Sequence, residues 1–177
     1  MKAYHISILF LLSVLFSCST PNSKSENSSE NLIPQQKLDI SNTLNLWHKA
    51  AANADFDTYF GYLDEESIYV GTDAVEVWTK SDFEMFSKPF FDKGKAWSFK
   101  AKSRNIYMIE NNNIAYFDEV LDTWMGECRG SGVVQLNDKG NWIIKHYVLS
   151  LIIPNNRMKK VVQLLSDTSK ISNTILK

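Results

Sequence analysis

Four strand-like runs between residues 97 and 153 limit the folds open to this chain of 177 residues. The runs cover about residues 97–110, 114–124, 128–137 and 141–153, and aromatic and β-branched side chains are frequent in them. The gaps between them hold asparagine or glycine, in residues 111–113, at Gly126 and in residues 137–140. Long strands joined by tight turns predict a four-stranded antiparallel meander.

Helical periodicity precedes these strands. Apolar residues recur at helical spacing after Leu38, at Ile40, Leu44, Trp47 and Ala51. A second set follows at Phe56, Tyr59, Phe60 and Leu63. These two sets predict two helices, and Ser67 to Val70 predict a short strand that Gly71 ends.

A third helix is predicted to begin at Ser81, because Ser81 and Glu84 have the spacing of a capping box. Its buried face would carry Phe83, Phe86 and Phe90. Pro89 should kink or restart this helix, since a proline ring clashes with the preceding turn, and Gly94 can close it.

Helices followed by a meander define an α+β protein. Residues 155–166 predict a last helix, with Met158, Val161, Val162 and Leu165 on one face. In the last strand both faces are apolar: Trp142, Ile144 and Val148 alternate with Ile143, Tyr147, Leu149 and Leu151. Helices on one side leave the other face of the sheet open, so we expect a second copy to cover it and form a homodimer.

The N-terminus resembles the signal of a bacterial lipoprotein. Lys2 precedes an apolar run from Ile6 to Phe16, which is shorter than the ~20 residues that cross a membrane. The run ends in Leu15-Phe16-Ser17-Cys18, which resembles a lipobox. The resemblance implies a signal peptide of residues 1–17, a diacylglycerol and usually a third acyl group on Cys18, and anchoring to a membrane of the bacterial cell envelope. An ordinary signal peptide that contains a cysteine is the alternative.

Residues 18–37 have the composition of a flexible tether. Serine and asparagine are frequent there and no aromatic residue occurs, so the segment cannot bury enough apolar surface to offset its ordering entropy. If Cys18 carries lipid, Cys128 has no disulfide partner. We expect Cys128 to be a buried small residue, with a nucleophile as the alternative.

Charge and motif content argue against several function classes. Nineteen Lys and Arg nearly balance twenty Asp and Glu, so no basic field would attract nucleic acid. His48 and His146 have no cysteine or second histidine at ligand spacing, so we predict neither a metal site nor a cofactor. The chain has no P-loop, dinucleotide-binding glycine motif or nucleophile elbow. Gly130-Ser131-Gly132 lies within a strand and predicts close backbone approach or a bulge.

Several short segments occur in a characteristic order between about residues 38 and 165. They are Gly71-Thr72-Asp73 with Trp78 and Phe83, Lys88-Pro89-Phe90-Phe91, Phe117-Asp118-Glu119, Arg129-Gly130-Ser131-Gly132, and Trp142-Ile143-Ile144 with His146-Tyr147, Leu149-Ser150 and Pro154-Asn155. Their order and spacing resemble the nuclear transport factor 2-like fold and, within it, the SnoaL-like family. This implies an α+β cone, with N-terminal helices packed on a curved antiparallel sheet, over a domain of residues 38–177. Isomerases, dehydratases, polyketide cyclases and binding or assembly modules share the fold, so the resemblance leaves the function open.

Enzymes of this family usually place a buried Asp or His inside the cone as a base. Asp118 and Glu119 are neighbours on a predicted strand, so one faces inward and the other outward. Glu119 shares its face with the apolar Phe117 and Leu121, which makes an inward Glu119 the less expected and more informative case. The alternative is that both carboxylates are ordinary surface groups.

Arg129 and His146 are further candidates. A hairpin turn at Met125-Gly126 would pair Arg129 with Asp122, so we expect a salt bridge, with a clamp for a ligand carboxylate as the alternative. His146 lies among apolar residues of the last strand, where a hydrogen-bonded core histidine is expected over a general base.

Tyr69, Trp78 and Trp124 are candidates to line a ligand pocket, because aromatic side chains supply apolar walls with a polar edge. Ordinary core packing is the alternative. The first function hypothesis is a lipid-anchored binding or accessory module whose cone holds a small apolar ligand or nothing. The second is an isomerase, cyclase or hydrolase in which Asp118 or Glu119 is the general base, assisted by His146 and Arg129.

Overall fold

A computed structural model describes residues 26–109 and 113–175 of the chain. The predicted signal segment, Cys18 and the turn residues Asn111 and Asn112 lie outside the described residues. The elements follow in the order α1 (Glu26–Ala52), α2 (Phe56–Gly61), β1 (Leu63–Val70), β2 (Val77–Thr79), α3 (Lys80–Asp92), β3 (Lys100–Met108), β4 (Ile114–Thr123), β5 (Gly126–Leu136), β6 (Trp142–Leu151), a 3₁₀ turn (Asn155–Arg157) and α4 (Met158–Ile175). The predicted α+β class is confirmed.

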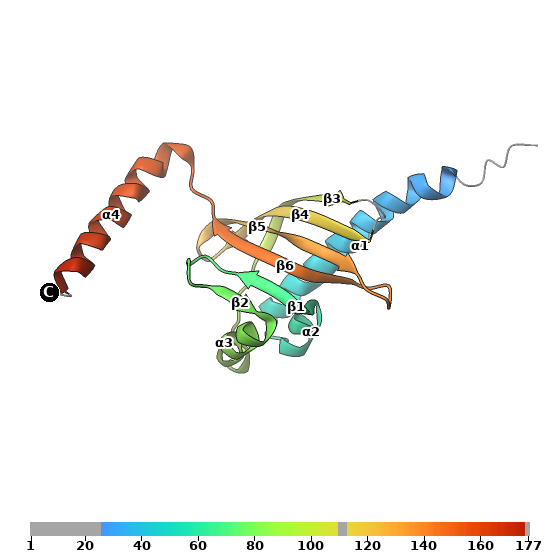
Figure 1. Cartoon of the computed structure of the whole chain (residues 1–177), viewed down its shortest axis with the longest axis horizontal. Coiled ribbons are helices and arrows are strands. Elements are labelled where there is room, and N and C mark those ends of the chain that lie inside the picture. The colour runs from blue at the N-terminus through green and yellow to red at the C-terminus, as the bar shows by residue number, and fades with distance from the viewer. Residues whose placement is uncertain (1–25, 110–112, 176–177) are drawn as a thin grey trace, which may run out of the picture.

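The strands form one curved sheet in the order β2-β1-β6-β5-β4-β3, and α1 crosses one of its faces (Figure 1). The antiparallel meander predicted for the last four strands is confirmed. Two features extend it: β1 pairs with β6 in parallel, and the short β2 pairs with β1 in antiparallel. The result is the predicted cone, with helices inside the curve of the sheet.

Helix α1 begins at Glu26, so residues 26–37 of the predicted tether are helical and include Pro34. Composition indicated that this segment buries little surface, but a helix that is already nucleated can propagate without burial. The predicted inner face of the helix is confirmed, because Ile40, Leu44, Trp47 and Ala51 are all buried. This face packs against β3 and β6.

The start of α3 lies earlier than predicted. Thr79 is the N-cap: its Oγ1 accepts from the amide of Asp82 at 3.2 Å and donates to the Asp82 carboxylate at 2.7 Å. The capping box predicted for Ser81 and Glu84 is therefore wrong. The segments that begin at Thr79 and at Ser81 have similar capping chemistry. The strand pairing of Thr79 with Ile68 determines that the helix begins after Thr79.

The buried face of α3 also differs from the prediction. Phe83, Ser87 and Phe91 are buried, whereas Phe86 and Phe90 are exposed. The Ser87 hydroxyl can be buried because it donates to the carbonyl of Phe83 at 2.6 Å. The helix continues through Pro89, so the predicted restart there is wrong.

An irregularity in β6 changes the predicted faces of that strand. Val133 pairs with His146 and Val134 with Ile144, so Lys145 is an extra residue on β6. Such a bulge reverses the alternation of side chains. Trp142, Ile144, Tyr147 and Leu149 are therefore all buried on the inner face, and the grouping of Trp142 and Ile144 with His146 and Val148 is wrong. The bulge therefore brings apolar residues at even positions before it and at odd positions after it onto the same buried face of β6.

The last helix is confirmed and longer than predicted, since α4 runs to Ile175. It projects away from the body of the molecule (Figure 1), and Val162, Leu164 and Leu165 are exposed on it. Within residues 26–109 and 113–175, no helix is long and apolar enough to cross a membrane.

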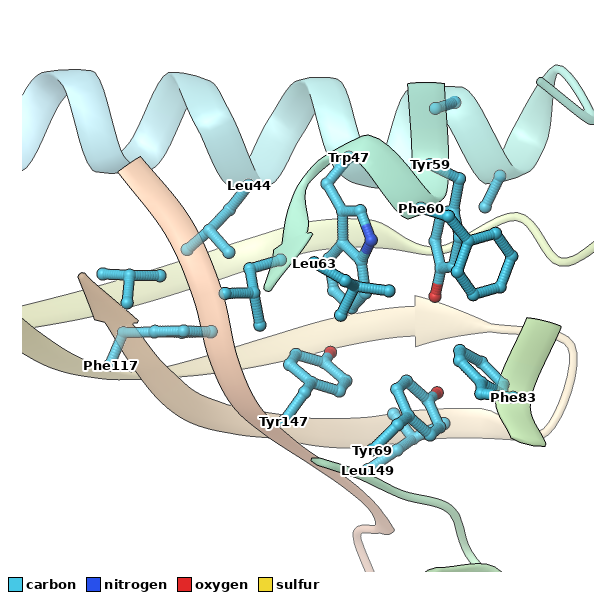
Figure 2. Packing of buried hydrophobic residues seen from close by; sticks show 14 of the residues in the cluster. Leu44, Trp47, Tyr59, Phe60, Leu63, Tyr69, Phe83, Phe117, Tyr147 and Leu149 are labelled. Carbon is cyan, nitrogen blue, oxygen red and sulfur yellow. The ribbon is translucent and has the colours of Figure 1, made fainter. Parts of the chain in front are cut away.

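The core lies between α1, α2 and the inner face of the sheet. Trp47 projects from α1, stacks on Tyr59 with ring centroids 5.0 Å apart, and meets Tyr147 edge-on at 4.7 Å (Figure 2). These aromatic contacts fix α1 and α2 against β6.

Candidate functional site

An aromatic pocket lies where α3 meets the end of the sheet, and we call it the mouth pocket. Its walls include Tyr69 of β1, Trp78 of β2, Phe83 and Phe86 of α3, Trp97 before β3, and Trp124 in the β4–β5 turn. Its volume is about 150 Å³. A dry apolar cavity of about this size is known to hold a benzene molecule.

Ring stacking holds the walls of the mouth pocket. Tyr69 stacks on Phe83 with centroids 4.0 Å apart, and Phe83 lies 5.6 Å from Trp97. Trp78 stacks on Phe86 at 4.9 Å. Figure 2 shows Tyr69 and Phe83 at the end of the core away from Phe117. These contacts hold Tyr69, Phe83 and Trp97 against one another and Trp78 against Phe86, whereas Trp124 is 82% exposed.

The loop between β1 and β2 brings one carboxylate to the mouth pocket. Gly71 donates its amide to the carbonyl of Glu76 at 2.8 Å, and the Asp73 amide donates to Glu76 Oε2 at 3.1 Å. A Cβ on Gly71 would lie 2.2 Å from Glu76 Oε2, so the folded-back side chain requires glycine there. Glu76 is the one charged side chain among the described residues that line this pocket.

Three of the four predicted ligand-binding residues, Tyr69, Trp78 and Trp124, line the mouth pocket together. Arg129 lies elsewhere. The β4–β5 turn falls at Trp124-Met125, one residue earlier than predicted, because Thr123 pairs with Gly126. Asp122 therefore pairs with Glu127, and the predicted Asp122–Arg129 salt bridge is wrong.

A second group of polar side chains surrounds Glu119, whose side chain is 0% exposed. His48 Nε2 lies 2.7 Å from Glu119 Oε1, and the Tyr147 hydroxyl donates to the same oxygen at 3.1 Å. Arg104 donates to Oε2 through Nε at 2.9 Å and Nη2 at 2.7 Å. We call Glu119, His48, Arg104 and Tyr147 the Glu119 cluster.

The Glu119 cluster joins four elements of the fold. Arg104 of β3 also donates through Nη1 to the carbonyl and hydroxyl of Ser41, each at 2.9 Å, and to Asn45 Oδ1 at 3.0 Å. Ser41, Asn45 and His48 all belong to α1. Glu119 belongs to β4, and Tyr147 belongs to β6. The cluster therefore clamps α1 onto the sheet.

Burial and the neighbouring His48 and Arg104 have opposite effects on the pKa of Glu119. Burial disfavours the carboxylate and raises its pKa, but hydrogen bonding and charge interaction with His48 and Arg104 lower it further than burial raises it, so the net pKa is lowered. Burial, reinforced by the charge of Glu119, raises the pKa of Tyr147, which keeps its proton as a donor. An ionised carboxylate with both oxygens occupied is a weak general base.

Gly130 makes room for this arrangement. A Cβ there would lie 2.2 Å from the Tyr147 hydroxyl and 2.9 Å from Glu119 Oε1. At Gly132 a Cβ would lie 2.2 Å from the carbonyl of His146. The close approach predicted for Gly130-Ser131-Gly132 is thereby confirmed, and at Gly130 the neighbour is the side chain of Tyr147 rather than backbone.

Asp118 and His146 face away from the core. Asp118 accepts from Arg129 Nη1 at 3.1 Å, which forms an exposed salt bridge on the outer face. His146 is half-buried and pairs with Val133 and Ile68, so the predicted core histidine lies on the outer face instead. Neither residue lines the mouth pocket, and neither does Glu119.

Several residues of the two sites were not predicted. His48 lies 71 residues before Glu119, and Arg104 lies 15 residues before it, so no local spacing connects them. Glu76 lies three residues after the segment Gly71-Thr72-Asp73 and belongs to none of the segments that carry the family resemblance. The one available signal was Glu119 itself, a charged residue placed at an apolar strand position.

Other hollows are less suited to an apolar ligand. A groove of about 730 Å³ beside α1 is open and lined largely by polar residues, among them Asp39, Asn137 and Lys139. His48 also lines a hollow of about 310 Å³ with Lys49 and Lys100. In the described part of the chain, no three His, Cys, Asp or Glu side chains are grouped to hold a metal ion. Cys128 is buried, as predicted, and forms no disulfide with another described residue.

Comparison with known proteins identifies the family. The SnoaL-like domain matches residues 40–154, which is more than half of the chain, so the protein belongs to the SnoaL-like family. A search of curated proteins found no match.

Solved structures share the fold. The association domain of C. elegans CaMKII is 21% identical, covers 67% of this chain and 97% of its own, and superposes with a TM-score of 0.55. A nuclear transport factor 2-like protein of unknown function from Pseudomonas putida is 12% identical over 73% of this chain and 90% of its own, with a TM-score of 0.53. A Parabacteroides distasonis protein provisionally described as a ketosteroid isomerase is 18% identical over 63% of this chain and 86% of its own, with a TM-score of 0.51.

Proposed function

We propose that this SnoaL-like domain is a binding module that holds a small, largely apolar ligand in the mouth pocket. The observation that carries this proposal is the convergence of Tyr69, Trp78 and Trp124, from separate parts of the chain, with Trp97 around one hollow of about 150 Å³. Aromatic walls with few polar groups are typical of small-molecule sites.

Acid–base catalysis by the cone carboxylates has weaker support. Glu119 has both oxygens engaged and is 0% exposed, while Asp118 is held by Arg129 on the opposite face. His146 and Arg129, the expected assistants, are also on that face. A substrate in the mouth pocket would meet none of these groups.

Ligand binding is tested by a matched pair of substitutions on α3. Phe86 lines the mouth pocket and is 41% exposed, whereas Phe90 is 45% exposed and outside it. We expect Phe86→Ala to weaken toluene binding about fivefold, because losing one aromatic wall costs about 1 kcal/mol. Phe90→Ala should leave the Kd unchanged. Equal effects of the two substitutions, measured by ¹⁹F NMR titration of the fluorotryptophan-labelled chain, would refute this site.

We further propose that Cys18 anchors the protein to a membrane of the bacterial cell envelope. The support is the lipobox-like segment Leu15-Phe16-Ser17-Cys18. Several acyl chains on one cysteine give stable anchoring, which one chain alone does not. Cells fed radiolabelled palmitate should label the wild-type protein, and Cys18→Ser should remove the label and keep the signal segment attached. A labelled Cys18→Ser protein would contradict the anchor, and Cys128→Ser is the control.

We also propose that a second copy covers the outer face of the sheet. Tyr107, Tyr116, Val133, His146 and Ile68 lie in one row across neighbouring strands on that face. Tyr116→Cys should therefore cross-link to a second copy in intact cells when a bismaleimide is added. Leu46→Cys on α1 is the control, because Leu46 and Tyr116 are both 49% exposed. Equal cross-linking of the two variants, or none, would count against this dimer.

A further inference from the structure

The mouth pocket combines aromatic faces with one negative charge. Trp78, Trp97, Phe86 and Tyr69 supply aromatic walls, and Glu76 is the one charged group among its described lining residues. Aromatic rings attract cations through the negative potential of their faces, and tryptophan does so most strongly. A carboxylate adds to this attraction, and no Lys, Arg or His side chain is among the described lining residues.

The carboxylate is held in place rather than free in solvent. The Asp73 amide fixes Glu76 Oε2 at 3.1 Å, and the side chain lies over Gly71, where a Cβ would approach it to 2.2 Å. Burial raises the pKa of Tyr69 and the charge of Glu76 raises it further, so the phenol beside the carboxylate stays neutral. The negative charge of this pocket therefore belongs to Glu76.

We infer that the natural ligand of the mouth pocket is a small organic cation, an alkylated ammonium whose charge is shared between Glu76 and the tryptophan faces. This inference rests on the proposed ligand-binding function and specifies its ligand class. A volume of about 150 Å³ fits an ammonium group with a few methyl substituents.

The test compares two probes of the same shape. Choline carries a trimethylammonium group, and 3,3-dimethylbutan-1-ol has a carbon in place of that nitrogen. Each is titrated into the full chain in a neutral sugar detergent, with 5-fluorotryptophan replacing tryptophan, and the ¹⁹F signal of Trp97 reports binding. We expect choline to bind at least about tenfold more tightly than its neutral isostere.

Three variants assign the selectivity. Glu76→Gln keeps the acceptor for the Asp73 amide but removes the charge, so the preference for choline should fall to about threefold, with the affinity for the alcohol unchanged. Gly71→Ala should displace the carboxylate and have the same effect. Glu66→Gln removes a carboxylate that is 88% exposed and outside the pocket, so it should leave the preference intact.

The outcomes separate the two proposals. Equal binding of the two probes, or tighter binding of the alcohol, would overturn cation recognition and leave an apolar ligand site. Failure of both probes to move the Trp97 signal would overturn the proposed function as well. A choline preference that survives in both Glu76→Gln and Gly71→Ala would overturn the role of Glu76.

Discussion

Glu119→Ala is expected to lower the free energy of unfolding by about 3–5 kcal/mol, because it leaves Arg104 and His48 buried without their anionic partner. For a urea slope of about 2 kcal/mol/M, this moves the unfolding midpoint down by about 1.5–2.5 M. The matched control is the preceding residue. Asp118→Ala removes a partly exposed salt bridge with Arg129 and the long, exposed hydrogen bonds from Asn105, and should cost about 0–1 kcal/mol.

The pH dependence gives a second readout of the same cluster. The folded-state pKa of Glu119 is below its ordinary value of about 4.3, so the stability that the carboxylate contributes is fully present above that value. It is lost as the pH falls through the lower, folded-state pKa. The difference in stability between wild type and Glu119→Ala should therefore shrink below about pH 4. A difference that stays constant on acidification would show that Glu119 is not stabilised as a carboxylate.

Gly130→Ala is expected to destabilise the protein by about 1–3 kcal/mol, since the new methyl group would lie 2.2 Å from the Tyr147 hydroxyl. Gly61→Ala is the control, because a Cβ at Gly61, in the last turn of α2, meets no atom within 4 Å. That change should be neutral or stabilise by up to about 1 kcal/mol. Urea denaturation of both variants provides the comparison.

A double-mutant cycle isolates the cause of the Gly130 effect. In a Tyr147→Phe background the atom nearest to the new methyl group is absent, so Gly130→Ala should cost less than it does in the wild type. Equal costs in both backgrounds would mean that the strain lies elsewhere in β5.

Local signals were sufficient to predict much of the fold. The gaps at Gly126 and residues 137–140 define hairpins within a few residues, and the periodicity of Ile40, Leu44 and Trp47 reports directly on the face that α1 buries. Where two local solutions compete, as at Thr79 and Ser81, sequence spacing alone does not choose between them. The pairing of Thr79 with β1 selects Thr79 as the N-cap of α3.

Non-local contacts account for what the sequence did not reveal. The parallel pairing of β1 with β6 joins segments about eighty residues apart, and the extra residue Lys145 in β6 has no local signature. Non-local contacts also build the Glu119 cluster and the mouth pocket. The aromatic residues Tyr69, Trp78 and Trp124 suggested a pocket by residue type, but the partners of Glu119 come from a helix and a strand that only the fold brings together.

We propose that ligands bind in the mouth pocket and that the Glu119 cluster is structural. The five tryptophans provide a direct test, because Trp78, Trp97 and Trp124 line the pocket, whereas Trp47 contacts His48 with ring centroids 5.0 Å apart. In ¹⁹F spectra of the 5-fluorotryptophan-labelled chain, a bound toluene or choline should shift the signals of Trp78, Trp97 and Trp124 and leave Trp47 and Trp142 unmoved. A shift confined to Trp47 would place the ligand at the Glu119 cluster and contradict the account.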